Sequence, residues 1–290
     1  MASSRYDGWG DWLPDGSGLL YSTNRTGRFE IWTETFREHN TRAIVTSDAF
    51  PEGPSFFIVQ GSVSPDGRSV TYVRFAQNTQ DIYVSAMAGS QPVKPLAGSA
   101  RATIGLGGGG EESPSWSPDG RFILLRVGDR VVKALASGGT AGTIIASDRA
   151  KGSEGQRDRF LPDGRSIVYR SADGLTQVNE DGAAPRLITR EQPLLWDLSP
   201  DGRLIVAMFE REKRSLDLAS IDVATGAIRT LRSLGQRPVS PDFTNYPDNL
   251  RAMRISPDGT RLMYAYLKPE ADIWILQGFA PEARSWWKLW

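Results

Sequence analysis

The stretch Ser113-Pro114-Ser115-Trp116-Ser117-Pro118-Asp119-Gly120-Arg121 contains the element that decides the fold, a Pro-Asp-Gly turn between two strands. Proline presets φ for a tight turn, the aspartate carboxylate folds back onto backbone N–H groups, and glycine accepts the positive φ that closes a hairpin. The same triplet starts at Pro14, Pro65, Pro118, Pro162, Pro200 and Pro257. Their spacing of 38 to 57 residues is typical of a propeller in which each repeat is one small antiparallel sheet.

Apolar residues flank every turn at constant positions, as expected for two half-buried strands. Two residues before each proline stand Trp12, Val63, Trp116, Phe160, Leu198 and Ile255, and five residues after it stand Leu19, Val70, Ile123, Ile167, Ile205 and Leu262. A third strand begins at Glu30-Ile31-Trp32, Asp81-Ile82-Tyr83 and Asp272-Ile273-Trp274, and Val131-Val132 and 175–178 fit it less well. Fourth strands are expected over 42–46, 92–96, 143–146, 185–189, 227–231 and 284–289. We therefore predict an all-β fold, a six-bladed β-propeller of four-stranded antiparallel blades, formed by one domain over residues 1–290, with Trp116 in its core.

The repeat units over 13–32 and 113–121 resemble the TolB-type propeller repeat of bacterial proteins, and the resemblance covers nearly the whole chain. It implies a scaffold or sensor portion, often attached to kinase, regulator or hydrolase modules. The residues that define this repeat are turn and core residues, so the resemblance is specific for fold and not for function.

Composition excludes several classes of function. The chain has 34 basic and 34 acidic side chains, so no net charge favours a nucleic-acid partner. It has no cysteine, and no apolar run approaches the roughly 18 residues of a membrane span. Because the first residues contain no apolar signal segment, we expect the chain as written to be cytoplasmic. A portion of a larger multidomain protein of the TolB type would instead be periplasmic or extracytoplasmic.

Catalytic motifs are scarce. The single histidine, His39, lies in a polar stretch and is interpreted as a solvated turn residue, so neither a multi-histidine metal site nor a cofactor is expected. There is no Gly-x-Ser-x-Gly elbow, and the glycine run of 105–112 lacks the Lys-Ser/Thr of a phosphate loop. We predict no catalytic residues. Pairs of carboxylates stay open, so a glycan-active hydrolase or lyase on a propeller is the alternative.

A polar residue at one constant position of every repeat, which we call the polar register, suggests a site on the propeller axis. Three residues before each proline stand Asp11, Ser62, Ser115, Arg159, Asp197 and Arg254, and all are polar. On the innermost strand of each blade they would form a ring in which neighbouring charges pair and water reaches partly buried side chains. Two interpretations stay open: packing positions that satisfy one another, or a tunnel that holds a small ligand or an ion.

Long connections over 47–57, 98–112, 148–156 and 232–249 identify a second candidate surface, because long loops on a rigid scaffold are where recognition usually occurs. The residues of interest on that face are Phe56, Glu111, Glu112, Arg157, Asp242, Tyr246 and Asp248. Taken together, the sequence predicts a non-catalytic scaffold or sensor domain. It would bind a protein, peptide or small ligand through its long-loop face or its central channel.

Overall fold

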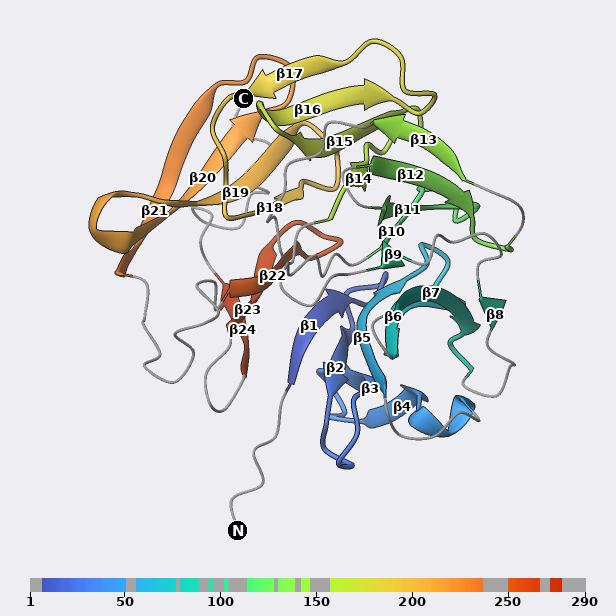
Figure 1. The fold of residues 1–290 in the computed structure, drawn as a ribbon. Helices are drawn as coiled ribbons and strands as arrows, with labels where there is room; N and C mark the ends of the chain where they lie inside the picture. The colour runs from blue at the N-terminus through green and yellow to red at the C-terminus, as the bar shows by residue number, and fades with distance from the viewer. Residues whose placement is uncertain are drawn as a thin grey trace.

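The structure of the chain is a computed structural model. Short antiparallel strands form nearly all of its regular structure (Figure 1). The structure describes residues 7–50, 56–76, 79–88, 94–95, 102–103, 114–127, 130–138, 142–146, 157–236, 250–266 and 272–277. Two 3₁₀ turns, η1 (Ser47–Ala49) and η2 (Glu212–Arg214), are the only helical elements of these residues. Within them, therefore, no helix has the length or the apolar character to cross a membrane.

Six sheets follow one another along the described chain, each built from consecutive strands. The first contains β1 (Asp7–Trp12), β2 (Gly18–Thr23), β3 (Glu30–Thr35) and β4 (Thr41–Val45). The second contains β5 (Phe56–Val63), β6 (Ser69–Ala76), β7 (Thr79–Ala86), β8 (Lys94–Pro95) and β9 (Ala102–Thr103). The third contains β10 (Ser115–Trp116), β11 (Phe122–Val127), β12 (Arg130–Leu135) and β13 (Thr143–Ala146).

The remaining three sheets continue this order around the centre of the molecule (Figure 1). The fourth contains β14 (Arg159–Phe160), β15 (Ser166–Ser171), β16 (Gly174–Asn179) and β17 (Arg186–Thr189). The fifth contains β18 (Leu195–Leu198), β19 (Leu204–Glu210), β20 (Ser215–Asp222) and β21 (Ile228–Gln236). The sixth contains β22 (Leu250–Ile255), β23 (Arg261–Tyr266) and β24 (Asp272–Gln277).

The protein is thus an all-β propeller with four-stranded antiparallel blades, but the structure shows five complete blades rather than the expected six. The sheet of the sixth Pro-Asp-Gly turn has three described strands, and the fourth strand expected over 284–289 lies outside the described residues. The third strands at Glu30, Asp81 and Asp272 are confirmed as parts of β3, β7 and β24, and β13 has the expected bounds. The pairing of β9 with β7 was not expected.

Serine completes each Pro-Asp-Gly turn, but it comes from two different positions. In four turns the residue before proline is a serine whose Oγ donates to the aspartate, as from Ser117 to Asp119 Oδ1 over 2.6 Å. The first and fourth turns have leucine there, and a serine after the turn replaces it: Ser17 donates to Asp15 over 2.7 Å and Ser166 to Asp163 over 3.1 Å. The repeated aspartates are therefore engaged in local turn chemistry.

The hydrophobic core consists of layers between neighbouring sheets. Six clusters of buried residues occur in the described chain, one for each pair of adjacent sheets, including the pair formed by the sixth and the first. Alternate residues of one strand serve two layers: Ile123 and Leu125 pack toward the second sheet and Leu124 toward the fourth. Because each sheet packs against a neighbour on both faces, its strands contain continuous apolar runs and not an alternation of apolar and polar residues.

Contacts between β1 and β22 close the ring, because they bring the first and sixth sheets side by side (Figure 1). Trp12 is 4% exposed and its Nε1 donates to Arg254 O over 3.1 Å. Trp116 makes the same kind of bond to Ser62 O over 2.9 Å, from the third sheet to the second. Trp116 is only half-buried and packs against the cluster between the second and third sheets, so its expected place in the core is confirmed only in part, and its indole joins two blades.

Candidate functional site

The innermost strands of the six sheets, β1, β5, β10, β14, β18 and β22, lie around the centre of the propeller (Figure 1). Each carries one residue of the polar register near its end. We call the group formed by Asp11, Arg157, Arg159, Asp197 and Arg254 the axial cluster. These residues lie far apart in the sequence, and the structure brings them within range of one another's charge.

Asp11 is the centre of the first half of the axial cluster. Its Oδ2 accepts hydrogen bonds from Arg157 Nη1 over 2.8 Å and from Ser62 Oγ over 2.9 Å. Its Oδ1 accepts from the backbone N–H of Trp12 over 3.0 Å. Arg157 also donates from Nη2 to Gly61 O over 2.8 Å, so this half connects the first, second and fourth sheets.

Asp197 is the centre of the second half. Its side chain is 1% exposed, and its Oδ1 forms an ion pair with Arg159 Nε over 2.9 Å. Its Oδ2 accepts a hydrogen bond from the backbone N–H of Ile255 over 2.9 Å. This carboxylate therefore connects the fourth, fifth and sixth sheets.

Arg254 has a different environment from the other two arginines. It is 2% exposed and donates from Nη1 to Met253 O over 2.6 Å. Its Nε and Nη2 have no hydrogen-bond partner within the described residues. A buried guanidinium group without a carboxylate partner is costly, because the interior does not replace the water that it has lost.

The axial cluster contains one more guanidinium group than carboxylates. Asp158 is buried as well, but it is not among the charges that act most strongly on Asp11, Arg157 or Arg254. Burial first and the like charge of Arg157 second lower the pKa of Arg254 to about 9. Burial also lowers the pKa of Arg157, and the charge of Asp11 offsets this only in part. Among the described residues, the axial cluster is thus rich in positive charge, and the exposure of its side chains ranges from 1% for Arg157 to 27% for Arg159.

Asp11 stays ionised in this environment. Burial alone would raise the pKa of its carboxyl, but the charges of Arg157, Arg254 and Arg159 and the hydrogen bond from Arg157 outweigh burial. The pKa of Asp11 consequently lies below its usual value of 3.8. Such a carboxylate accepts hydrogen bonds at neutral pH and does not donate a proton.

The sequence-predicted residues have several outcomes. The structure brings together Asp11, Arg159, Asp197 and Arg254, and the expected pairing of neighbouring charges occurs between Arg159 and Asp197. Asp11 instead pairs with Arg157, because Arg157 reaches across from the fourth sheet. The expected partial burial is wrong for Asp197 and Arg254, whose strands pack closely enough to exclude water.

Arg157 was expected on the long-loop surface, and this placement is wrong because its side chain is 1% exposed on the axis. The signal that could have placed it there is the strand period of two from Arg159. Of the other residues expected on that surface, Glu111, Glu112, Asp242, Tyr246 and Asp248 lie outside the described residues. Nor does the structure describe the side chain of Phe56.

Two β-bulges border the axial cluster and were not foreseen from the sequence. The register shifts between Gly8 and Asp11 in β1 and between Val59 and Ser62 in β5. At these bulges Trp9 and Gln60 have positive φ values of 48° and 62°, a strained conformation for residues other than glycine. Gln60 is fully buried, and both ends of its side-chain amide lack a partner in the described part of the chain.

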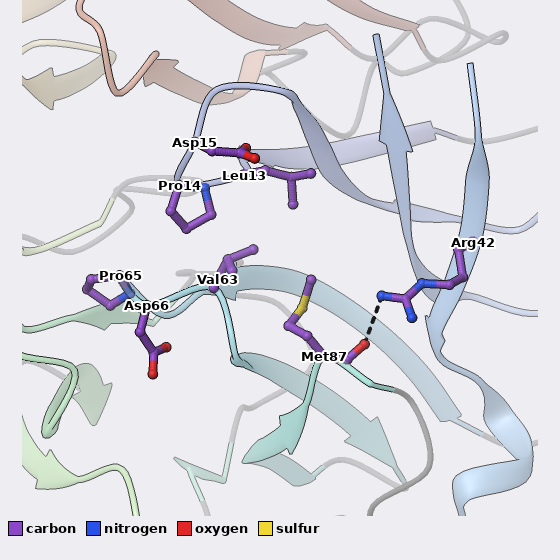
Figure 2. A pocket seen from close by; sticks show the side chains of 9 residues that line it. Leu13, Pro14, Asp15, Arg42, Val63, Pro65, Asp66 and Met87 are labelled. Atoms are coloured by element: carbon purple, nitrogen blue, oxygen red, sulfur yellow. Dashed lines mark hydrogen bonds between the residues drawn. The ribbon is translucent and has the colours of Figure 1, made fainter. Parts of the chain in front are cut away.

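A pocket of about 500 Å³ lies on the Pro-Asp-Gly face, between the first two sheets (Figure 2). It is lined by Leu13, Pro14, Asp15, Arg42, Val63, Pro65, Asp66, Gly67 and Met87. Arg42 Nη2 donates to Met87 O over 3.0 Å and so joins the two sheets on one side of the pocket. The sequence directed attention instead to the long connections, most of whose residues lie outside the described chain.

Metal-binding side chains do not gather in the described residues: no group of three or more His, Cys, Asp or Glu side chains could hold an ion there. His39 is mostly exposed and lies 3.7 Å from Glu34. The described carboxyl groups with a resolved pKa shift are all lowered, at Asp11 on the axis and elsewhere by local hydrogen bonds.

Comparison with known proteins identifies relatives by fold. No family profile matches the chain. A curated protein of Agrobacterium fabrum, the uncharacterized protein Atu1656, is 26% identical over 145 residues, which are 46% of this chain and 47% of that protein. The match thus spans about half the length of that relative.

Two solved structures show the architecture over most of the chain. The putative TolB from Agrobacterium tumefaciens superposes with a TM-score of 0.57 at 18% identity, over 92% of this chain and 88% of that one. An oligogalacturonate lyase from Vibrio parahaemolyticus gives a TM-score of 0.57 at 12% identity, over 92% of this chain and 73% of that one. These superpositions show that the chain shares its propeller fold with a TolB-like protein and with a lyase, and they do not separate the two functions.

Proposed function

We propose that this chain is a non-catalytic binding propeller, a scaffold or sensor domain that takes a protein, a peptide or a small ligand at its axis. The observation that carries the proposal is the axial cluster, in which three guanidinium groups meet two carboxylates among the described residues. A buried charge excess destabilises the fold, so its presence at the meeting point of the inner strands is best explained by a ligand that balances it.

The axial carboxylates favour binding over glycan hydrolysis. A glycosidase needs a carboxyl group with a raised pKa that donates a proton to the leaving oxygen. Asp11 has a lowered pKa, and both oxygens of Asp11 and of Asp197 already contact donors. These groups are suited to orient arginine side chains for a ligand.

The proposal includes a sixth blade. The sheet of β22, β23 and β24 packs against the fifth sheet through Met253, Ile255 and Leu262 and against the first through Met263. Apolar layers on both of its faces support a closed ring of six, in which 284–289 would supply the fourth strand of the last blade. We further propose a protein or peptide as partner, and the long-loop residues Glu111, Glu112, Tyr246 and Asp248 as a second contact region.

Selection of binders from a random peptide library on the immobilised chain tests this function. The variant Arg159→Met removes one guanidinium group and leaves the charges of the axial cluster balanced, while Arg203→Met removes an exposed arginine of a Pro-Asp-Gly turn as the control. We expect peptides that bind the wild type and the control but not Arg159→Met.

The opposite result would be a set of peptides that bind all three proteins equally. Conversion of oligogalacturonate or another oligosaccharide by the chain, followed by mass spectrometry, would instead establish the enzymatic alternative. Both measurements use the complete chain.

A further inference from the structure

One edge of the buried Arg254 guanidinium group, formed by Nε and Nη2, makes no hydrogen bond in the described part of the chain. Its Nη1 donates to Met253 O over 2.6 Å, and the backbone carbonyl of Arg254 itself accepts from Trp12 Nε1 over 3.1 Å. The edge formed by Nε–H and Nη2–H has no partner within the described chain, although the side chain is 2% exposed. Orphaned donors at such depth indicate a bound group.

The carboxylates of Asp11 and Asp197 have contacts with other donors. Asp11 accepts through Oδ1 from Trp12 N and through Oδ2 from Arg157 and Ser62. Asp197 forms an ion pair with Arg159 through Oδ1, which has no hydrogen-bond partner in the described chain, and it accepts from Ile255 N through Oδ2. In the described chain, therefore, neither carboxylate is hydrogen-bonded to this edge of Arg254, and an additional anion would satisfy it.

The geometry of the free edge selects the class of anion. Nε–H and Nη2–H of one arginine point in the same direction, and their separation matches the two oxygens of a carboxylate, which accepts both bonds in one plane. The axial cluster has one positive charge in excess, and a carboxylate brings one negative charge. Arg157, whose charge acts on Arg254, likewise has a buried Nε without a hydrogen-bond partner in the described chain.

We propose that the propeller axis binds a carboxylate group, held by a two-hydrogen-bond contact with the Nε and Nη2 edge of Arg254. This deepens the proposed binding function and rests on it, because it names the chemical group of the ligand that reaches the axis. The carboxylate comes from a small organic acid or from the C-terminus of a peptide, and the chemistry at Arg254 is the same.

Thermal unfolding of the complete chain in sodium acetate, with sodium chloride at the same ionic strength as reference, tests the proposal. The unfolding midpoint of the wild type should rise with acetate and reach a plateau, while chloride has no such effect. Arg254→Met should abolish the response, and Arg203→Met should retain it. Arg254→Lys keeps the charge but loses the planar edge, so acetate should bind about tenfold more weakly.

The Nε–H resonance of Arg254 in a ¹⁵N spectrum gives a second measurement that does not depend on the folding of Arg254→Met. The signal is assigned by its absence in Arg254→Lys, and saturating acetate should shift it. Triglycine and its C-terminal amide distinguish a peptide C-terminus from a small organic acid. If the site accepts a peptide C-terminus, triglycine should shift the signal and the amide should not. Acetate alone does so if the site takes small acids only.

An Arg254 signal that no carboxylate moves, or an acetate response that survives Arg254→Met, would overturn the proposal. If library peptides still depended on Arg159 in that case, the binding function would stand without the carboxylate. A moved signal without any such peptide would establish the carboxylate site and refute the peptide partner.

Discussion

Replacement of Trp12 by phenylalanine and by alanine should show how the propeller ring is closed. The indole of Trp12 is 4% exposed, packs with Leu19 and Met263 between the first and sixth sheets, and donates from Nε1 to Arg254 O over 3.1 Å. Arg261 lies over the same ring at 4.7 Å from its centroid. The side chain thus contributes burial, a hydrogen bond and a cation–π contact at one place.

The two substitutions separate these contributions. Trp12→Phe keeps most of the apolar contact but removes the hydrogen bond from Nε1 to the backbone carbonyl of Arg254, which also lies in the β22–β23 ladder, at a cost of about 0.5 to 1.5 kcal/mol. Trp12→Ala empties the interface and should cost about 3 to 5 kcal/mol, as for other buried aromatic residues. Trp116→Phe is the matched control, since its indole makes the corresponding bond to Ser62 O. Because Trp116 is only half-buried, Trp116→Ala should cost less than Trp12→Ala.

Urea unfolding at 25 °C, followed by far-ultraviolet circular dichroism, measures these free energies of unfolding. The two phenylalanine variants should lose similar amounts, and the alanine variants should differ. An unchanged midpoint for Trp12→Phe, or a loss below about 1 kcal/mol for Trp12→Ala, would refute the idea that this residue closes the ring.

Three further predictions concern the turns, the axial cluster and blade packing. The hydrogen bonds from the Ser117 side chain and, to a smaller extent, from the Arg121 backbone N–H lower the pKa of the Asp119 carboxyl below 3.8. The ionised carboxylate therefore stabilises the folded state above about pH 4, and this stabilisation is lost as the pH falls through the folded pKa. The difference in urea midpoint between wild type and Asp119→Asn should therefore shrink from pH 7 to about pH 3, and a constant difference would contradict it. Asp197→Asn breaks the ion pair of a buried carboxylate with the partly exposed Arg159 and should cost about 1 to 3 kcal/mol in the same unfolding assay. An unchanged midpoint would show that this pair does not stabilise the fold. Gly174→Ala would place a Cβ 1.9 Å from Thr189 O at a φ of +143°, whereas at Gly67, with a φ of +71°, a Cβ would meet open space. Gly174→Ala should therefore lower the unfolding midpoint far more than Gly67→Ala. Equal losses would show that the β15–β16 hairpin shifts to accommodate the added methyl group.

Local chemistry explains why the strands were predictable. Each Pro-Asp-Gly turn determines its own hairpin through bonds that span only a few residues, such as Ser117 to Asp119. The period of two then assigns Ile123 and Leu124 to opposite faces, and both are buried against neighbouring sheets. The same reasoning put the residues three positions before each proline on one side of the inner strands.

The pairing of charges was not predictable in the same way. Arg157 precedes a strand of two residues and follows a long connection, so sequence reasoning assigned it to the loop surface. Its contact with Asp11 joins residues that are 146 positions apart. The pocket between Pro14 and Pro65 also depends on how two blades lie together, because each turn alone supplies only one wall.

From its sequence alone, this protein was recognisable as a propeller with a TolB-like repeat and a polar inner register, since turns, strand period and apolar positions are properties of neighbouring residues. Only the tertiary structure decided that Asp11 pairs with Arg157, that Asp197 pairs with Arg159, and that one edge of Arg254 is buried without a hydrogen-bond partner among the described residues. The physical reason is that these distances depend on the closure of the ring, which brings inner strands from distant repeats to a common axis and removes their side chains from water.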